Sequence, residues 1–360
     1  MHKPRKGPAR TVPPGQLIQR ELDARGWTQN DLAEVMGRPA QAISEIITGK
    51  KQITADTAIE LGEAFGVNAA FWSTLQSNYN LHQARQQKSA HDVARRSQLH
   101  SATPVLELIK RGWLGITRKS PIEDQESAVC AFLGISSIGA RAELSISFRS
   151  AEHRGPDWTA KVAWAKRVEH LAGPQVKKLP KYNKAALEKA IPKLLKLAAT
   201  EAGVSEVPGF LAKLGIGFLV LPHLPKTYLD GAILPVDGHP VVALSLRYDR
   251  IDNFWFTLLH ELAHCLRGDY VFIEQNGEDE DGADEQATSW LMPEADFNAF
   301  LRTVSTGFSL KVIESFATKL ERHPGIVVGQ LQKRVADFGY SKGRNHLVKV
   351  KGLLVNYCHS

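Results

Sequence analysis

The sequence carries a motif with metal-binding chemistry, His260-Glu261-Leu262-Ala263-His264. On a helix, positions i and i+4 lie on one face, so the two imidazoles point to the same spot. Zinc binds imidazole nitrogens at about 2.0 to 2.1 Å, and a catalytic zinc keeps one coordination position for water. The intervening Glu261 is then placed to accept a proton from that water. The motif therefore predicts bound Zn²⁺, with His260 and His264 as ligands and Glu261 as the catalytic base.

A third protein ligand is expected from the acidic stretch that follows the motif. Glu280 and Asp284 are four residues apart, so on one helix they face the same way. Glu280 is then available to bind the metal, while Asp284 accepts the free N–H of a ligand histidine and fixes its tautomer. Ala283 and Ala287 would let this helix approach the first one closely. Glu285 remains the alternative third ligand, and most of the acidic stretch also fits a solvated loop.

The N-terminal part of the chain has the pattern of a helix-turn-helix, in which a tight turn joins two short helices. The major groove of DNA is about 12 Å wide and admits one helix. Gln29 begins the second helix of the pattern, and Gln41 and Ser44 lie on the outer face of the third. Lys50 and Lys51 follow at the end of that helix, where they would meet phosphates. The pattern alone also fits an ordinary helical bundle with polar surface residues.

Several short sequence motifs are distributed along this N-terminal part. They are Pro14-Gly15, Thr28-Gln29-x-x-Leu32-Ala33, Ile43-Ser44-Glu45-Ile46-Ile47-x-Gly49-Lys50, Ile53-Thr54 and Phe71-Trp72…Leu75-Gln76-x-Asn78-Tyr79-x-Leu81. Through them, residues 13–85 resemble the Cro/cI-type (XRE) helix-turn-helix domains, and within these the HigA antitoxin branch. The resemblance implies that the third helix enters the major groove, with Arg38, Gln41 and Ser44 nearest the bases. We expect a homodimer on an inverted repeat of double-stranded DNA, because one such domain reads only a short half-site.

A second set of motifs surrounds the two histidines. It comprises Ser245-Leu246-Arg247-Tyr248, Asn253-Phe254-Trp255-Phe256-Thr257-Leu258-x-His260-Glu261-Leu262-Ala263-His264, Glu280-x-x-Ala283-Asp284-x-x-Ala287…Leu291-Met292-Pro293 and His323-Pro324-Gly325-Ile326-Val327-Val328-Gly329-x-Leu331. Through these motifs, residues 205–340 resemble the ImmA/IrrE family, which implies a gluzincin-like zinc peptidase domain. Gly282 departs from the pattern, because relatives more often carry a second glutamate there. Glycine in a helix costs about 1 kcal/mol, so we expect this helix to be locally loose.

The elements that must position these residues give a chain that is mainly α with a small α+β domain. Five short helices are expected in the N-terminal bundle. Buried strands are expected at 217–221, 231–234 and 240–246, with a turn between the last two at Asp237-Gly238. An apolar helix over 254–266 follows and carries the His-Glu-x-x-His motif. In such a helix an unliganded pair of histidines and a glutamate would be costly, which favours a metal.

The domain organisation follows from these elements and from shifts in composition. We expect a disordered basic arm at 1–13, a DNA-binding domain at 14–85, a helical linker or middle region at 86–205, the peptidase-like domain at 206–340 and a C-terminal tail at 341–360. The middle region contains several glycines and prolines between helical stretches and no chemical motif.

Composition restricts the class of protein further. With 43% hydrophobic and 23% charged residues, the 360-residue chain is globular and long enough for more than one domain. Three cysteines exclude a disulfide scaffold, and neither a secretory signal nor an apolar run of membrane-spanning length is seen. These features favour the cytoplasm and no membrane partner. The net charge of +7 favours a polyanionic partner. Residues 161–200 carry ten Lys or Arg against two acids, which also fits a solvated helical face.

Two functions remain open from the sequence. The first is a DNA-binding transcriptional regulator with a zinc-dependent endopeptidase domain that cleaves a repressor or another regulatory protein. The alternative is an antitoxin-type autorepressor with a toxin partner, in which the zinc domain is a sensor or scaffold without proteolysis. An intact Glu261 leaves catalysis available to the first.

Overall fold

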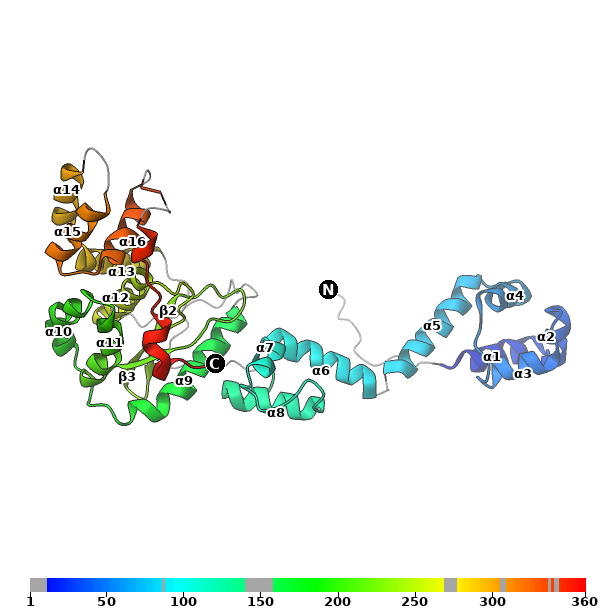
Figure 1. The fold of residues 1–360 in the computed structure, drawn as a ribbon. Coiled ribbons are helices and arrows are strands. Elements are labelled where there is room, and N and C mark those ends of the chain that lie inside the picture. Colours follow the sequence, from blue (N-terminus) through cyan, green and yellow to red (C-terminus); the bar gives the residue numbers. More distant parts are fainter. Residues whose placement is uncertain are drawn as a thin grey trace, which may run out of the picture. The chain divides into compact units, whose positions relative to one another are not determined.

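The computed structural model describes residues 12–85, 88–139, 158–268, 277–304, 309–335, 338–339 and 343–360. The chain separates into two compact units, Met1–Ser97 and Gln98–Ser360, and each is described by itself (Figure 1). Most of the basic arm expected at 1–13 lies outside the described residues. Among the helices that are described, none is both long and apolar enough to cross a membrane.

The first unit begins with the expected bundle of five helices. They are α1 (Pro14–Arg25), α2 (Gln29–Val35), α3 (Ala40–Ile47), α4 (Ala55–Phe65) and α5 (Ala69–Arg85). Thr28 caps α2 by accepting a hydrogen bond from the backbone N–H of Asp31, whose carboxylate accepts the Thr28 N–H in return. Thr54 caps α4. Gly15 lets α1 lie directly against α3, because a Cβ at this position would be 2.0 Å from the Ile47 carbonyl oxygen.

The second unit combines helices with one small mixed sheet. After α6 (Lys88–Ala102), its helices are α7 (Val105–Lys110), α8 (Ile122–Leu133), α9 (Trp158–Val176), α10 (Lys184–Leu197), α11 (Ala202–Lys213), α12 (Ile251–Arg267), α13 (Gly277–Leu291), α14 (Glu294–Thr303), α15 (Leu310–Leu320), α16 (Pro324–Arg334) and the short 3₁₀ helices η1 (Arg344–His346) and η2 (Lys351–Tyr357). This confirms the expectation of a mainly helical chain.

The sheet has the strand order β1–β3–β2. β1 (Gly217–Val220) runs parallel to β3 (His239–Leu244), while β2 (Gly231–Val236) runs antiparallel to it. The turn between β2 and β3 lies at Asp237-Gly238, as expected from the sequence. Both turn residues have positive φ, 47° and 82°, which matches the right-handed twist of a two-residue hairpin.

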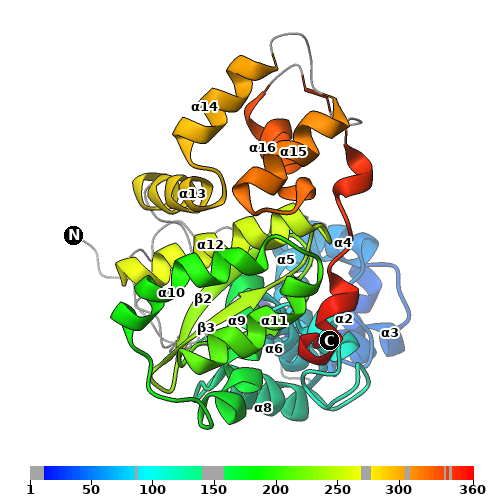
Figure 2. The ribbon, with the colours of Figure 1, turned by 60° about the vertical axis from the view of Figure 1, so that its left-hand side comes forward.

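Each face of the sheet packs into a separate hydrophobic core. Leu219 and Leu234 belong to a core formed with α9 and the helices before it. Phe218, Ile233 and Val242 belong to the other core, formed with α10, α11 and α12. Successive strand residues point to opposite faces, so each strand contributes to both cores. Figure 2 shows the next layer, in which α12 runs between the strands and α13.

The residues before and after position 205 belong to the same compact unit. Residues 98–360 form one compact unit, and α9 contacts all three strands. The guanidinium of Arg111, after α7, donates to the carbonyl oxygens of Pro222 and His223 at 2.8 Å each, just beyond β1. The physical reason is that a sheet with two apolar faces needs a cover on both, and the middle region supplies one of them.

The described part of the expected C-terminal tail also packs into this unit. Val350 and Leu354 are buried, and they belong to the core that contains α12. Cys358 pairs with Val220 in an isolated parallel bridge beside β1. These apolar residues follow neither a helical nor a strand period in the sequence, so the pattern did not indicate their burial.

Candidate metal centre

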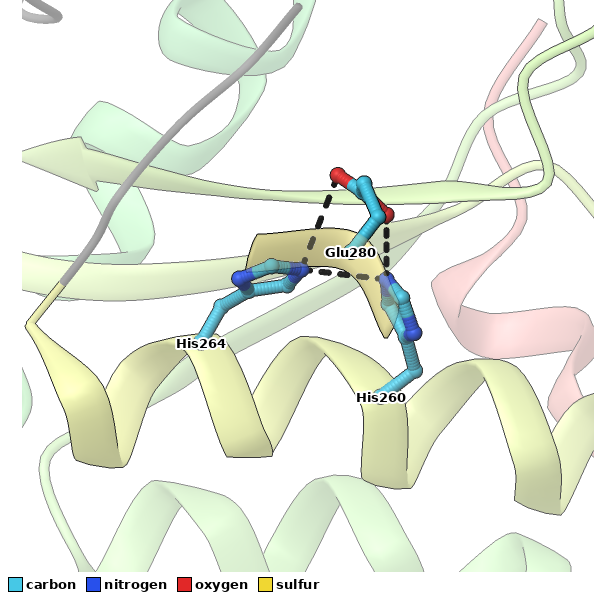
Figure 3. Close-up of side chains that lie close together, drawn as sticks. All are labelled: His260, His264 and Glu280. Carbon is cyan, nitrogen blue, oxygen red and sulfur yellow. Dashed lines mark hydrogen bonds and ion pairs between the residues drawn. The ribbon is translucent and has the colours of Figure 1, made fainter. Parts of the chain in front are cut away.

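Helix α12 places the two histidines on the side that faces α13. Its residues Phe254, Trp255 and Leu258 are fully buried, which anchors the helix in the core beneath the sheet. His260 and His264 are one turn apart, and both side chains point toward Glu280 on α13 (Figure 3). The helix–sheet packing therefore fixes where the imidazoles meet.

The two histidines and Glu280 converge in a group that could bind a metal ion. His260 Nε2 lies 3.1 Å from His264 Nε2 and 3.1 Å from Glu280 Oε2, and His264 Nε2 lies 3.8 Å from Glu280 Oε1. One donor atom from each residue lies within 4.8 Å of the others. Two nitrogens bound to one tetrahedral zinc are about 3.3 Å apart, so the observed separation fits such an ion.

Asp284 and Lys333 extend this group behind His260. Asp284 Oδ1 lies 2.9 Å from His260 Nδ1, which leaves Nε2 of the same ring directed at Glu280. Lys333 Nζ, on α16, lies 3.2 Å from Asp284 Oδ2 and 4.2 Å from the centre of the Phe256 ring. A carboxylate in this position orients a histidine and increases its basicity as a ligand.

Glu261 is buried on the side of α12 that meets β2. The residue is 6% exposed, and burial raises the pKa of its carboxyl group to about 7. At the start of β2, Gly231 leaves the space that this side chain needs. A Cβ at Gly231 would be 3.0 Å from Glu261 Oε1 and 2.7 Å from Thr257 Cγ2. The close approach of strand and helix at this point therefore requires glycine.

Hydrogen bonds and charge shift the pKa values of the three donor groups. Although burial opposes the shift, hydrogen bonds to Asp284 and Glu280 raise the pKa of His260 to about 10. The pKa of His264 is also raised. Burial opposes this shift, whereas the hydrogen bond to Glu280 and the charge of Glu261 favour it. Hydrogen bonds from both histidines hold the pKa of Glu280 well below its usual range. A dication that enters this group therefore displaces protons from the histidines.

Helix α13 approaches α12 closely, as its alanines suggested. Ala283 and Ala287 are fully buried, and they direct Glu280 and Asp284 toward the histidines. The rival ligand Glu285 is exposed and lies outside the donor group. At Gly282, the guanidinium of Arg267 occupies the space of a side chain, since a Cβ would be 2.3 Å from its Nη2. The helix continues through this glycine without a break.

A cavity of about 720 Å³ opens over the donor group. It is lined from β2 by Gly231, from α12 by Glu261 and from α16 by Gln330 and Lys333. Gln330 is 5% exposed, and its Oε1 has no hydrogen-bond partner among the described residues. Neither Gln330 nor Lys333 was predicted from the sequence. Their spacing of three residues, which places two side chains on one face of a helix, was the available signal.

In the first unit, three of the six expected DNA-contacting residues are exposed. Gln41, at the start of α3, is exposed, and Lys50 and Lys51 after the helix are also exposed. Gln29 and Ser44 are half-buried. Arg38 is half-buried and hydrogen-bonded through Nη2 to Glu60 Oε1 on α4 at 3.0 Å. The structure therefore commits the Arg38 guanidinium to an internal ion pair.

Comparisons with known proteins identify this first unit. A family model described as a helix-turn-helix matches residues 18–72. Virulence-associated protein A′ of Dichelobacter nodosus is 39% identical over 75 residues, which is 21% of this chain and 65%, less than two thirds, of that protein. Virulence-associated protein I of the same species is 32% identical over 83 residues, or 23% of this chain and 77% of that protein. The chain belongs to this helix-turn-helix family. Its N-terminal domain is accordingly a DNA-binding domain.

Two further matches concern the same part of the chain. The uncharacterized HTH-type transcriptional regulator YddM of Escherichia coli (strain K12) is 31% identical over 71 residues, or 20% of this chain and 76% of that protein. A solved structure of an addiction module antidote protein of the HigA family from Coxiella burnetii is 31% identical. It covers 23% of this chain and 91% of that one, with a TM-score of 0.22, too low to support a structural argument. Each match covers less than a quarter of the chain, so none identifies a peptidase domain.

Proposed function

We propose that the chain is a cytoplasmic DNA-binding transcription regulator whose second unit is a zinc-dependent endopeptidase acting on a repressor or another regulatory protein. The observation that supports this best is the placement of His260, His264 and Glu280 beside the buried carboxylate of Glu261. The cavity above them is open enough to admit a peptide segment.

The residues around this group suit peptide hydrolysis. When bound, zinc supplies Lewis-acid chemistry and lowers the pKa of a water to about 7. Burial raises the pKa of Glu261 to about 7, and a nearby dication would lower it again, so the carboxylate would be ionised at neutral pH. Glu261 can then take a proton from the attacking water and deliver it to the leaving amine. Asp284 would hold His260 with Nε2 toward the metal.

On DNA, the proposal assigns base contacts to α3 and phosphate contacts to the residues after it. Gln41 and Ser44 lie on the face that would enter the major groove, and Lys50 and Lys51 would meet phosphates. Arg38 would contact a base only by giving up its bond to Glu60. A homodimer on an inverted repeat would double the short half-site.

The alternative is an antitoxin-type autorepressor that neutralises a toxin, with the second unit as a metal sensor or scaffold. The resemblance of residues 13–85 to HigA-type antitoxins supports this alternative. In that case the donor group would bind metal, but Glu261 would serve no reaction.

Substitution of Glu261 separates the two proposals. Glu261→Gln keeps the shape of the side chain and removes the base. If the second unit is a peptidase, the variant retains zinc and DNA binding, but the genes controlled by the target protein no longer respond to the inducing signal. Transcript levels in cells carrying wild type, Glu261→Gln or the exposed control Glu285→Gln provide the measurement. A wild-type response of Glu261→Gln, with zinc content confirmed by elemental analysis, would contradict proteolysis and favour the alternative.

A further inference from the structure

The second unit carries a strongly basic surface that neither the metal site nor the helix-turn-helix uses. Residues 177–196, from the end of α9 through α10, contain seven lysines and a single acid, Glu188. All seven lysines are exposed: Lys177, Lys178, Lys181, Lys184, Lys189, Lys193 and Lys196. We call this surface the lysine face.

The periodicity of α10 concentrates part of this charge on one side. Lys189, Lys193 and Lys196 recur at the i, i+4 and i+7 spacing, so they share the solvent side of the helix. The opposite side is buried through Leu187, Leu194 and other apolar residues. Packing of α10 against the core thus holds the three ammonium groups in one row.

The lysines of this face are not neutralised within the molecule. Among the residues that the structure describes, none of the seven forms an ion pair with an acidic side chain. Like charges four residues apart destabilise a helix by about 0.2 to 0.5 kcal/mol per pair. An exposed face that carries mixed charges would avoid this cost. The concentration of unpaired positive charge therefore points to a polyanionic partner.

We infer that the lysine face binds the phosphate backbone of double-stranded DNA, as a second contact surface in addition to the helix-turn-helix. DNA is favoured because the first unit of the same chain is a DNA-binding domain, and covalent linkage to it raises the effective concentration of duplex for the second unit. A lipid surface is less suited, since the exposed residues between the lysines of α10 include Ala185, Ala186 and Pro192 and offer no large apolar side chain for insertion.

The dimensions of α10 fit this partner. At about 1.5 Å per residue, Lys189 to Lys196 spans roughly 10 Å along the helix axis. Phosphates on one strand follow each other at about 3.4 Å along the DNA axis, so the row matches about three of them. Lysine acts as a point charge toward phosphate, and the face contains no side chains arranged to read bases. Its contribution to binding is therefore independent of sequence.

The test compares the salt dependence of DNA binding by the full-length protein and by two triple variants with the same change of charge. The first, K189E/K193E/K196E, reverses the row on α10. The second, K119E/K311E/K349E, reverses three lysines that are exposed but scattered over the second unit. Binding to a fluorescein-labelled duplex of random sequence is followed by anisotropy between about 50 and 200 mM KCl. Thermal unfolding establishes that both variants are folded.

We expect K189E/K193E/K196E to lower the slope of log affinity against log salt by about 2 to 3, and to weaken binding at least about ten-fold at the low-salt end. The scattered control should change the slope by less than one. Equal slopes for the two variants would overturn the inference. So would loss of binding to phosphatidylserine vesicles by the α10 variant with an unchanged DNA slope. Absence of any salt-dependent DNA binding by the wild type would instead contradict DNA binding by the first unit. This result therefore distinguishes failure of the proposed DNA-binding function from failure of the lysine face alone.

Discussion

The hydrogen bond between Asp284 and His260 provides a sharp test of the metal centre. Asp284→Asn keeps the size of the side chain and removes its negative charge. Loss of such an orienting carboxylate lowers metal affinity by about 10- to 100-fold. Here the Asp284 side chain is 44% exposed and shares its other oxygen with Lys333, so water and the ammonium already screen its charge. We therefore expect the lower end of the range, about ten-fold or 1.4 kcal/mol.

The pH dependence of this effect follows from the same hydrogen bond. Asp284 contributes to the raised pKa of His260, so the wild type must release a tightly held proton when zinc binds. In Asp284→Asn the pKa of His260 falls and the proton leaves more easily. The lower pKa thus offsets part of the loss of zinc affinity at acidic pH. The loss relative to wild type should therefore grow from about pH 6 to about pH 8.

Zinc affinity for this comparison is measured by competition with a chromophoric chelator over that pH range. Glu285→Gln is the matched control, because Glu285 lies next to Asp284 on α13, is exposed and is outside the donor group. Affinity of the control should stay within two-fold of wild type. An Asp284→Asn variant that binds zinc as tightly as wild type at about pH 8, or a control that loses as much, would refute the assignment.

Three other predictions concern the same site. His264→Ala should abolish stoichiometric zinc binding, and Glu280→Gln should weaken zinc binding strongly. Elemental analysis after dialysis measures both, and a zinc content equal to wild type in both variants would show that these residues are not ligands. Because the pKa of His260 is raised to about 10 and that of His264 is also raised, the logarithm of wild-type zinc affinity should rise by at least about one per pH unit between about pH 6 and 8. A flat profile would contradict the proton competition. Gly231→Ala should lower the free energy of unfolding by about 1 to 3 kcal/mol in thermal or urea denaturation, because the new Cβ would lie too close to Glu261. A variant more stable than wild type would show that the strand can move away from the helix.

Local patterns account for the parts of the fold and site that were predictable. The i, i+4 spacing on one helix places His260 beside His264, and the same spacing on the next helix places Glu280 beside Asp284. Thr28 caps the expected helix, because its hydroxyl satisfies a backbone N–H three residues away. In each case the interacting residues are about one helical turn apart, so their geometry follows from the helix itself.

Contacts between distant segments were not predictable in this way. Lys333 reaches Asp284 from α16 across 49 residues, and no periodicity in the chain relates the two. The apolar runs of the strands indicated burial but not which helices cover each face, so the sequence did not indicate that the middle region covers one of them. The bond of Arg38 to Glu60 likewise joins the turn between α2 and α3 to α4 across 22 residues, which is a tertiary property.

The two-sided burial of the small sheet also couples parts of the second unit that belong to different hydrophobic cores. Trp164 on α9 packs against one face and Trp255 on α12 belongs to the core on the other, so neither helix can leave without exposing the strands between them. Unfolding of this unit should accordingly be cooperative. A ligand that binds only the native state stabilises everything within one cooperative transition, by about 2.7 kcal/mol at a hundred times its Kd. A zinc ion held by α12 and α13 would in this way protect α9 from unfolding across the full thickness of the sheet.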